Sequence, residues 1–464
     1  MMDEIPVGIS ETRAMLRSGR SSVVEHVQSV LTAIHKVDSE LGAFVSVASD
    51  TALRDAELAD QCIRALGLEA WRDWPLRGVA VSVKDLIQTR DLPTRRGSLL
   101  PNPRPRVDAP AVARLRAAGA IVVGKTTTSE YGWCGSTKSR LGPATRNPWN
   151  PERSAGGSSG GAAAAVSAGL CAAALGTDGA GSIRIPASFC GVVGFKPSFG
   201  TVPYVPACAD RLAHAGPITR SVRDVIELMP ILAGPHACDP DSALRVIDLA
   251  GPCEPSSLRI GWLVFPGTSA EVHQAGAAVR DALRAQGHRV ESMDVPFPDP
   301  HPALVDLIAA SEAADTTPEQ EELCDPGRLA VVRYGRTVSG AAVLRAEAVR
   351  LALRTTMRSI MASYDLLAMA TVPIEPFDVD AIGPPWAAEP EDLAWTAWTP
   401  ATYPFNLTGQ PAISLPAGLS SAGLPIGVQL VGPFGGDKLV LSTALQVEAQ
   451  LEPLPAVPDR VLEG

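Results

Sequence analysis

The stretch Gly156-Gly157-Ser158-Ser159-Gly160-Gly161 is followed by a second one, Gly176-Thr177-Asp178-Gly179-Ala180-Gly181-Ser182. Each places serines in a loop framed by glycines. Glycine permits positive φ and lets the backbone approach a ligand closely, so such a loop can aim several N–H groups at one point. The second stretch therefore predicts an oxyanion hole, formed by the backbone of Gly179, Ala180, Gly181 and Ser182.

The segment between the two loops, Ala162 to Leu175, is rich in alanine and apolar throughout. It predicts a buried helix that runs into a short strand and so brings the two serine loops together. His214 is the histidine closest in sequence to Ser182, but it lies 32 residues further along the chain. A Ser-His-Asp triad is therefore not indicated.

Lys84 is the candidate base. It ends a stretch in which Val79, Val81 and Val83 alternate with small residues, a pattern typical of a strand. A lysine among apolar neighbours loses hydration, which lowers its pKa and leaves part of the amine neutral. Lys84 can then act as a general base.

These motifs, with Gly181 to Pro197 and Phe405 to Pro411, resemble the amidase signature family over most of the chain. The resemblance implies a Ser-cisSer-Lys triad in which Ser182 is the nucleophile, Ser158 the bridging serine and Lys84 the base. It also implies a cis peptide bond between Gly157 and Ser158. The activity that it implies is amide hydrolysis through an acyl-enzyme.

The fold that the resemblance implies is α/β, with a large mixed central β-sheet surrounded by α-helices in one domain over residues 1–464. We divide this domain into an N-terminal helical region (1–74), a catalytic core (75–220) and a remaining α/β portion (221–464). The periodicity predicts helices within 10–70, mostly loop over 126–155, and largely helical structure over 303–362. It also predicts the alternating elements 111–118, 120–125, 222–232, 258–264, 270–286 and 289–293.

One position departs from the family pattern, because Ala180 stands where the usual Asp-x-Gly-Gly-Ser motif has a glycine. At positive φ its methyl group would add roughly 1 to 2 kcal/mol of strain, whereas at negative φ it costs little. We interpret it as a variation that preserves activity. Asp178 and Arg184 flank the nucleophile, and we expect them to hold the loop by charge-assisted hydrogen bonds.

The segment 373–400 has little regular pattern and contains Trp386, Trp395 and Trp398. Long irregular segments in compact domains are often functional loops, so we expect this one to cover the acyl pocket together with Tyr131, Gly132 and Trp133. The alternative is that these aromatic residues only fill the core. With no Arg or Asp securely placed to hold a charged substrate, the pattern favours apolar or aryl amides, while carbamates and ureas stay open.

Other functions remain open at this stage. Within the family, the A subunit of glutamyl-tRNA amidotransferase supplies ammonia to a partner, and in another class the chain could be a binding protein whose oxyanion hole Ala180 impairs. Gly119 to Thr126 has the spacing of a phosphate-binding loop, but its apolar β-branched residues predict a strand instead.

The chain has 464 residues and a formal net charge of −10, which argues against nucleic acid or an anionic membrane as a partner. The expected partners are a small amide or carbamate and water, and the resemblance makes a homodimer possible.

No apolar stretch has the length of a signal sequence or a membrane span, so we expect a cytoplasmic protein. No His or Cys spacing indicates a metal or another cofactor, and the eight cysteines, including Cys190 in an apolar stretch, are expected to be reduced.

Overall fold

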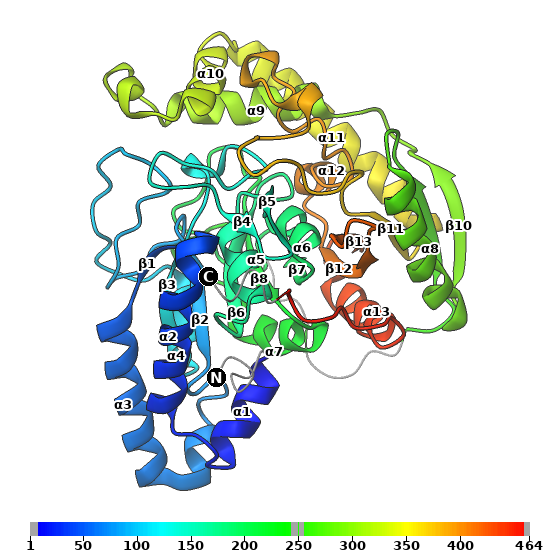
Figure 1. Ribbon diagram of the computed structural model, residues 1–464. Helices are drawn as coiled ribbons and strands as arrows, with labels where there is room; N and C mark the ends of the chain where they lie inside the picture. The colour runs from blue at the N-terminus through cyan, green and yellow to red at the C-terminus, as the bar shows by residue number, and fades with distance from the viewer. Residues whose placement is uncertain (1–7, 243–248, 250–254, 459–464) are drawn as a thin grey trace.

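The computed structural model describes residues 8–242, 249 and 255–458 (Figure 1). Its centre is a mixed sheet of 11 strands, in the order β1-β3-β2-β6-β8-β7-β12-β13-β11-β9-β10. These strands are β1 (Phe44–Val47), β2 (Ala80–Lys84), β3 (Ile121–Thr126), β6 (Ala173–Asp178), β7 (Val193–Lys196), β8 (His214–Thr219), β9 (Arg259–Val264), β10 (Arg289–Asp294), β11 (Leu366–Ala370), β12 (Ala412–Leu419) and β13 (Pro425–Val431). A separate hairpin joins β4 (Arg146–Asn147) to β5 (Asn150–Ser154). The predicted α/β fold with a large mixed sheet is confirmed.

Helices surround this sheet (Figure 1). They are α1 (Ile9–Arg17), α2 (Val23–Leu41), α3 (Ser49–Leu66), α4 (Pro110–Ala117), α5 (Gly160–Ser167), α6 (Arg184–Cys190), α7 (Val222–Leu232), α8 (Ala270–Ala285), α9 (His301–Ala314), α10 (Pro326–Gly335), α11 (Gly340–Ser363), α12 (Pro404–Thr408) and α13 (Asp437–Glu448). Short 3-10 helices cover Gly67–Trp71, Glu130–Gly132, Pro318–Leu323, Pro385–Ala387 and Pro390–Asp392. Among the described residues, no helix is both long and apolar enough to cross a membrane.

The alternation along β2 divides the core into two layers. Val81 and Val83 belong to an apolar cluster that includes residues of α4, α7 and α13, whereas Ala80 belongs to a second cluster with α2, α3 and α5. Successive side chains of a strand point to opposite faces of its sheet, so these clusters cover the two faces. Helix α5 is buried along its whole length, which its small residues allow.

Strand pairing brings the two serine loops to Lys84. Strands β2 and β6 are parallel neighbours, with Val83 opposite Leu175, so their carboxyl ends meet at one edge of the sheet. Helix α5 directly follows the first serine loop, and β6 leads directly into the second. The return from one loop to the other through a helix and a strand is therefore confirmed.

Some local expectations need correction. The helix and strand predicted over residues 162–175 correspond to α5 and the start of β6; the helix begins two residues earlier, at Gly160, and ends at Ser167, and Gly169, with a positive φ of 70°, turns the chain towards β6. Strand β1 was missed within the predicted helical region; all four of its residues are only half-buried, which weakens the apolar alternation. The hairpin β4–β5 lies in the segment expected to be mostly loop.

The apparent phosphate-loop spacing belongs to a strand, as predicted, because Ile121–Thr126 form β3. Lys125 is buried there, and its Nζ donates to the Ile87 carbonyl oxygen (2.7 Å) and to Thr94 Oγ1 (2.8 Å). Seven cysteines are free thiols, Cys190 being buried in the core, while Cys253 lies outside the described residues.

Candidate active site

Lys84 is buried at the end of β2, and its amine contacts residues from both serine loops. Nζ donates to Ser158 Oγ at 2.8 Å and to Thr177 Oγ1 at 2.9 Å. Burial lowers the pKa of Lys84 to about 7, although the negative charge of Asp178 and the Cys134 thiol oppose this shift. A substantial fraction of the amine is therefore neutral at neutral pH, as the strand position predicted.

Ser158 is held by a tightly packed backbone. The peptide bond between Gly157 and Ser158 is cis, as the resemblance implies. Gly157 has no room for a side chain, because a Cβ there would lie 2.1 Å from the Ser136 carbonyl oxygen. Gly132 approaches from another side, where a Cβ would lie 3.0 Å from Ser158 Oγ. The glycines around Ser158 thus serve close backbone packing.

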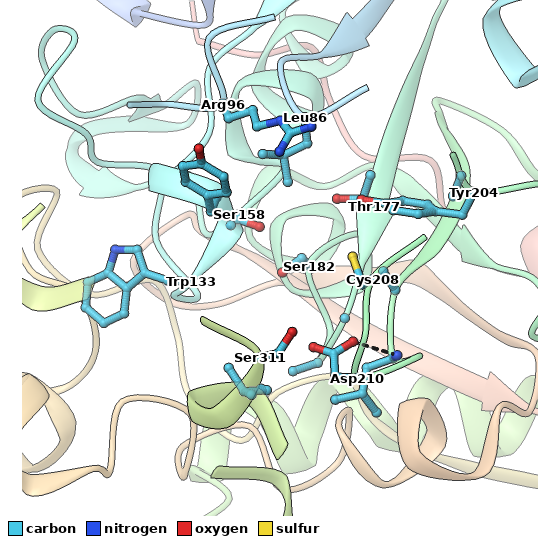
Figure 2. A pocket seen from close by; sticks show the side chains of 18 of the residues that line it. Leu86, Arg96, Trp133, Ser158, Thr177, Ser182, Tyr204, Cys208, Asp210 and Ser311 are labelled. Carbon is cyan, nitrogen blue, oxygen red and sulfur yellow. Dashed lines mark hydrogen bonds between the residues drawn. The ribbon is translucent and has the colours of Figure 1, made fainter. Parts of the chain in front are cut away.

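Ser182 lies between β6 and α6 and borders the same cavity as Ser158, where Figure 2 shows the two side chains next to each other. The backbone joins the loops as well, because the N–H of Ser159 donates to the Ser182 carbonyl oxygen at 3.1 Å. Ser159 Oγ also donates to the Thr177 carbonyl oxygen at 3.0 Å. The structure therefore brings Ser158 and Ser182 to one cavity, with the buried Lys84 in contact with Ser158.

Asp178 and Arg184 form a buried ion pair beneath the second loop, with Arg184 Nε 2.9 Å from Asp178 Oδ2. Arg184 also donates to the Thr402 carbonyl oxygen (3.0 Å) and to Asn406 Oδ1 (2.6 Å). Burial by itself raises the pKa of Asp178, but the Arg184 guanidinium outweighs it and holds this pKa well below its ordinary value. Both residues hold the second serine loop, as expected from the sequence.

The loop backbone differs from expectation at Gly181. Its N–H donates to Asp178 Oδ1 at 2.7 Å, so this group is engaged within the loop and does not serve the cavity. Within the part of the chain that the structure describes, the N–H groups of Gly179, Ala180 and Ser182 donate to no protein acceptor. Glycine is required at 181, where φ is 125° and a Cβ would lie 2.6 Å from Thr402 Oγ1.

Ala180 has no positive φ, so its methyl group causes no left-handed strain. Its carbonyl oxygen accepts a hydrogen bond from Thr402 Oγ1 at 2.7 Å. At Gly179 a Cβ would meet nothing within 4 Å. The loop therefore accommodates Ala180 without distortion.

The cavity has a volume of about 190 Å³ and is bordered on one side by aromatic residues. Tyr131, Gly132, Trp133, Trp395 and Trp398 line it, as expected. Trp386 does not: its side chain is 60% exposed and lies outside the cavity lining. The buried indoles also belong to the core, since Trp395 Nε1 donates to the Trp133 carbonyl oxygen at 2.8 Å.

Four charged residues that the sequence analysis missed also line the cavity: Arg96, Asp210, Glu312 and Asp315. They come from three distant segments, so no local pattern could have grouped them. The sequence had indicated no Arg or Asp securely placed to hold a charged substrate, whereas the structure places such side chains in the cavity lining. In the part of the chain that the structure describes, no group of three or more His, Cys, Asp or Glu side chains is arranged to hold a metal ion.

Two further residues at the site had a sequence signal that was not used. Thr177 contacts Lys84 from within the second serine stretch, and Asn406 lies in the Phe405 to Pro411 motif. Asn406 Nδ2 donates to the main-chain oxygen of Asp178 and to its Oδ1, both at 2.9 Å. The distant motif therefore supports the second serine loop.

Known proteins resemble the chain in sequence and in structure. Residues 25–441 match the family model described as Amidase. The A subunit of glutamyl-tRNA(Gln) amidotransferase from Thermus thermophilus is 37% identical, over 94% of this chain and 96% of that protein.

Two solved structures are similar over nearly the whole chain. 6-Aminohexanoate cyclic dimer hydrolase, complexed with substrate, has a TM-score of 0.85 and 30% identity, covering 98% of this chain and 99% of its own. The A subunit of glutamyl-tRNA(Gln) amidotransferase from Thermotoga maritima has a TM-score of 0.75 and 30% identity, covering 93% of this chain and 94% of its own.

Proposed function

The chain belongs to the amidase signature family of enzymes, and we propose that it hydrolyses the C–N bond of a small carboxylic amide through an acyl-enzyme on Ser182. The observation that carries this proposal is the contact of 2.8 Å between Lys84 Nζ and Ser158 Oγ beside Ser182. Neutral Lys84 can accept a proton through Ser158, and Ser182 can then attack the carbonyl carbon.

The proposed steps conserve every proton. The proton of Ser182 passes through Ser158 to Lys84 as the Ser182 oxygen bonds to the carbonyl carbon. The resulting oxyanion accepts hydrogen bonds from the N–H groups of Gly179, Ala180 and Ser182. The proton on Lys84 then returns through Ser158 to the departing nitrogen, and ammonia or an amine leaves. Water cleaves the remaining ester by the same relay, which releases the acid.

The aromatic side of the cavity supports an apolar or aryl portion in the substrate. Trp133, Trp395 and Trp398 present carbon-rich surfaces there. Carbamates and ureas require the same attack and the same oxyanion hole, so they belong to the substrates to be tested. The charged residues that line the cavity would contact a polar part of the substrate, away from the tryptophans.

A second candidate function is supply of ammonia from glutamine, as one component of a tRNA-dependent amidotransferase. The sequence relative from Thermus thermophilus favours it. The structural comparison includes both functions, since the cyclic dimer hydrolase has a TM-score of 0.85 and the amidotransferase subunit one of 0.75. The sequence relatives support supply of ammonia more strongly, and hydrolysis of a free amide is the activity that can be tested on the isolated chain.

Intact-protein mass spectrometry with a serine-directed fluorophosphonate tests the nucleophile. We expect one adduct on the wild type, none on Ser182→Ala, and slow labelling of Lys84→Ala because its base is lost. Circular dichroism controls for folding. An adduct that persists in Ser182→Ala would contradict the assignment.

Release of ammonia or amine from a panel of amides, anilides, carbamates and L-glutamine separates the candidate functions. Turnover of simple amides by the isolated chain supports a stand-alone hydrolase. Turnover of L-glutamine and of no other compound in the panel would favour the amidotransferase role.

A further inference from the structure

Among the described residues that line the cavity, more side chains are acidic than basic. Three carboxylates, Asp210, Glu312 and Asp315, line it against one guanidinium, Arg96. Glu312 lies in the last turn of α9 and Asp315 directly follows that helix, where the helix dipole is negative as well. Asp210 belongs to the segment between β7 and β8. Two remote parts of the chain therefore bring negative charge to the same space.

The carboxylates differ in how well they are paired. Arg328 Nε lies 2.7 Å from Glu312 Oε2 and balances that charge. Among residues 8–242, 249 and 255–458, no Lys, Arg or His nitrogen lies within 4.0 Å of the carboxylate oxygens of Asp210 or Asp315. Asp210 Oδ1 accepts the N–H of Leu212, at 3.0 Å. These two carboxylates thus face the cavity without a cation from the described chain.

Arg350 comes near Asp210 but binds the backbone. Its NH1 donates to the main-chain oxygen of Asp210 (2.8 Å), and its NH2 to that of Arg211 (2.7 Å). This holds the segment in place and leaves the carboxylate open. Burial raises the pKa of Asp210, the Leu212 N–H and Arg350 partly offset this, and the negative charge of Asp315 raises the pKa further. A cation in the cavity would relieve this repulsion.

Among the described residues, Arg96 forms no ion pair within 4.0 Å with any of these three carboxylates. Its guanidinium is 5.5 Å from the ring centre of Tyr131. Figure 2 shows Arg96 beside Leu86 on one side of Ser158 and Ser182, and Asp210 with Ser311 on the other. Arg96 therefore does not neutralise Asp210.

We propose that the preferred substrate is an amide whose acyl chain carries a protonated amine, bound by Asp210 and Asp315 while the carbonyl carbon lies at Ser182. This inference rests on the proposed hydrolase function and names its substrate class. The apolar part of the chain lies against the tryptophans, and the ammonium group replaces the missing cation. Asp210 and Asp315 are then specificity-determining residues.

A series of primary amides tests this proposal. ω-Amino amides with acyl chains of about three to six carbons are compared with unsubstituted amides and with dicarboxylic acid monoamides of the same lengths. We expect the best amino amide to exceed its neutral counterpart about 10- to 100-fold in kcat/KM, since a hydrogen bond to a charged group contributes this much. The monoamides should be the poorest substrates.

Two variants test whether Asp210 and Asp315 cause the preference for amino amides over neutral amides. Asp210→Asn and Asp315→Asn should each lower kcat/KM about tenfold for the amino amide, mainly by raising KM. The neutral amide should change less than about threefold. Asp281→Asn is a matched control on α8, because the Asp281 side chain is 75% exposed and pairs with Arg284 at 3.5 Å on the same helix. It should change neither substrate.

The outcomes separate this proposal from the function on which it rests. Equal hydrolysis of amino and neutral amides, or an equal loss for both in Asp210→Asn, overturns the ammonium proposal and leaves the hydrolase intact. Absence of any amide turnover, together with no fluorophosphonate adduct on Ser182, overturns both.

Discussion

Asp178, buried against the second serine loop, and Asp210, in the lining of the cavity, show opposite electrostatics. Asp178 is buried against Arg184, and its pKa is held well below the ordinary value. Asp210 is only half-buried, its carboxylate has no ion-pair partner among the described residues, and partial burial raises its pKa. A carboxylate with its own cation supports the loop, whereas one without a cation is available to a ligand.

The comparison divides the site into a rigid part and a selective part. The rigid part is the second serine loop, whose backbone and side chains are held by Asp178, Arg184 and Asn406. The selective part consists of the carboxylates that line the cavity. Changes in the first should affect every substrate equally, and changes in the second should discriminate between substrates.

The largest difference is expected in folding stability. Asp178→Asn leaves the buried Arg184 charge unpaired, which should lower the free energy of unfolding by about 3 to 5 kcal/mol. Asp210→Asn removes a carboxylate that burial disfavours and should change it by less than about 1 kcal/mol. Urea denaturation at about pH 7 measures both.

A double variant sharpens this stability test. Asp178→Asn combined with Arg184→Met should lose less than the sum of the two single variants, because the double variant leaves neither charge buried without its partner. Equal losses in Asp178→Asn and Asp210→Asn would show that the two aspartates do not differ as we infer.

The second difference concerns pH. Burial lowers the pKa of Lys84 to about 7, and only its neutral amine accepts the proton of Ser182. For a neutral amide we therefore expect kcat/KM to fall about tenfold per pH unit below about pH 7 and to level off above it. Asp210→Asn should keep this profile. A profile that is flat from about pH 5 to 8 would exclude Lys84 as the base.

The smallest effect is expected at Ala180. Because its φ is not positive, Ala180→Gly should change kcat/KM less than about threefold for any substrate. Gly181→Ala is the contrast, since φ there is 125° and a Cβ would lie 2.6 Å from Thr402 Oγ1. Steady-state kinetics of both variants show whether the second serine loop tolerates a substitution only at a position where the backbone φ permits it.

Much of the candidate site could be predicted from the sequence, because its motifs resemble those of a known family and some of its signals are local. Glycines around Ser158 and Ser182 indicated loops whose backbone can approach a ligand closely, and the strand that ends at Lys84 indicated a buried amine. The role of Gly181 could not be predicted, since the direction of its N–H depends on where the Asp178 carboxylate lies. Trp386 belongs to the same irregular segment as Trp395 and Trp398, but of these three residues it is the one whose side chain lies outside the cavity lining.

The sequence by itself predicted the α/β fold and the proposed roles of Lys84, Ser158 and Ser182, because its motifs resemble those of the amidase signature family. Periodicity and glycine placement act over a few residues and predicted only individual helices, strands and loops. Only the tertiary structure decided which charges meet at the substrate. Asp210 reaches the cavity from one segment, and Glu312 and Asp315 from another about a hundred residues later. Whether a carboxylate is paired depends on its neighbours in space, and those neighbours are set by the packing of the whole sheet and its helices.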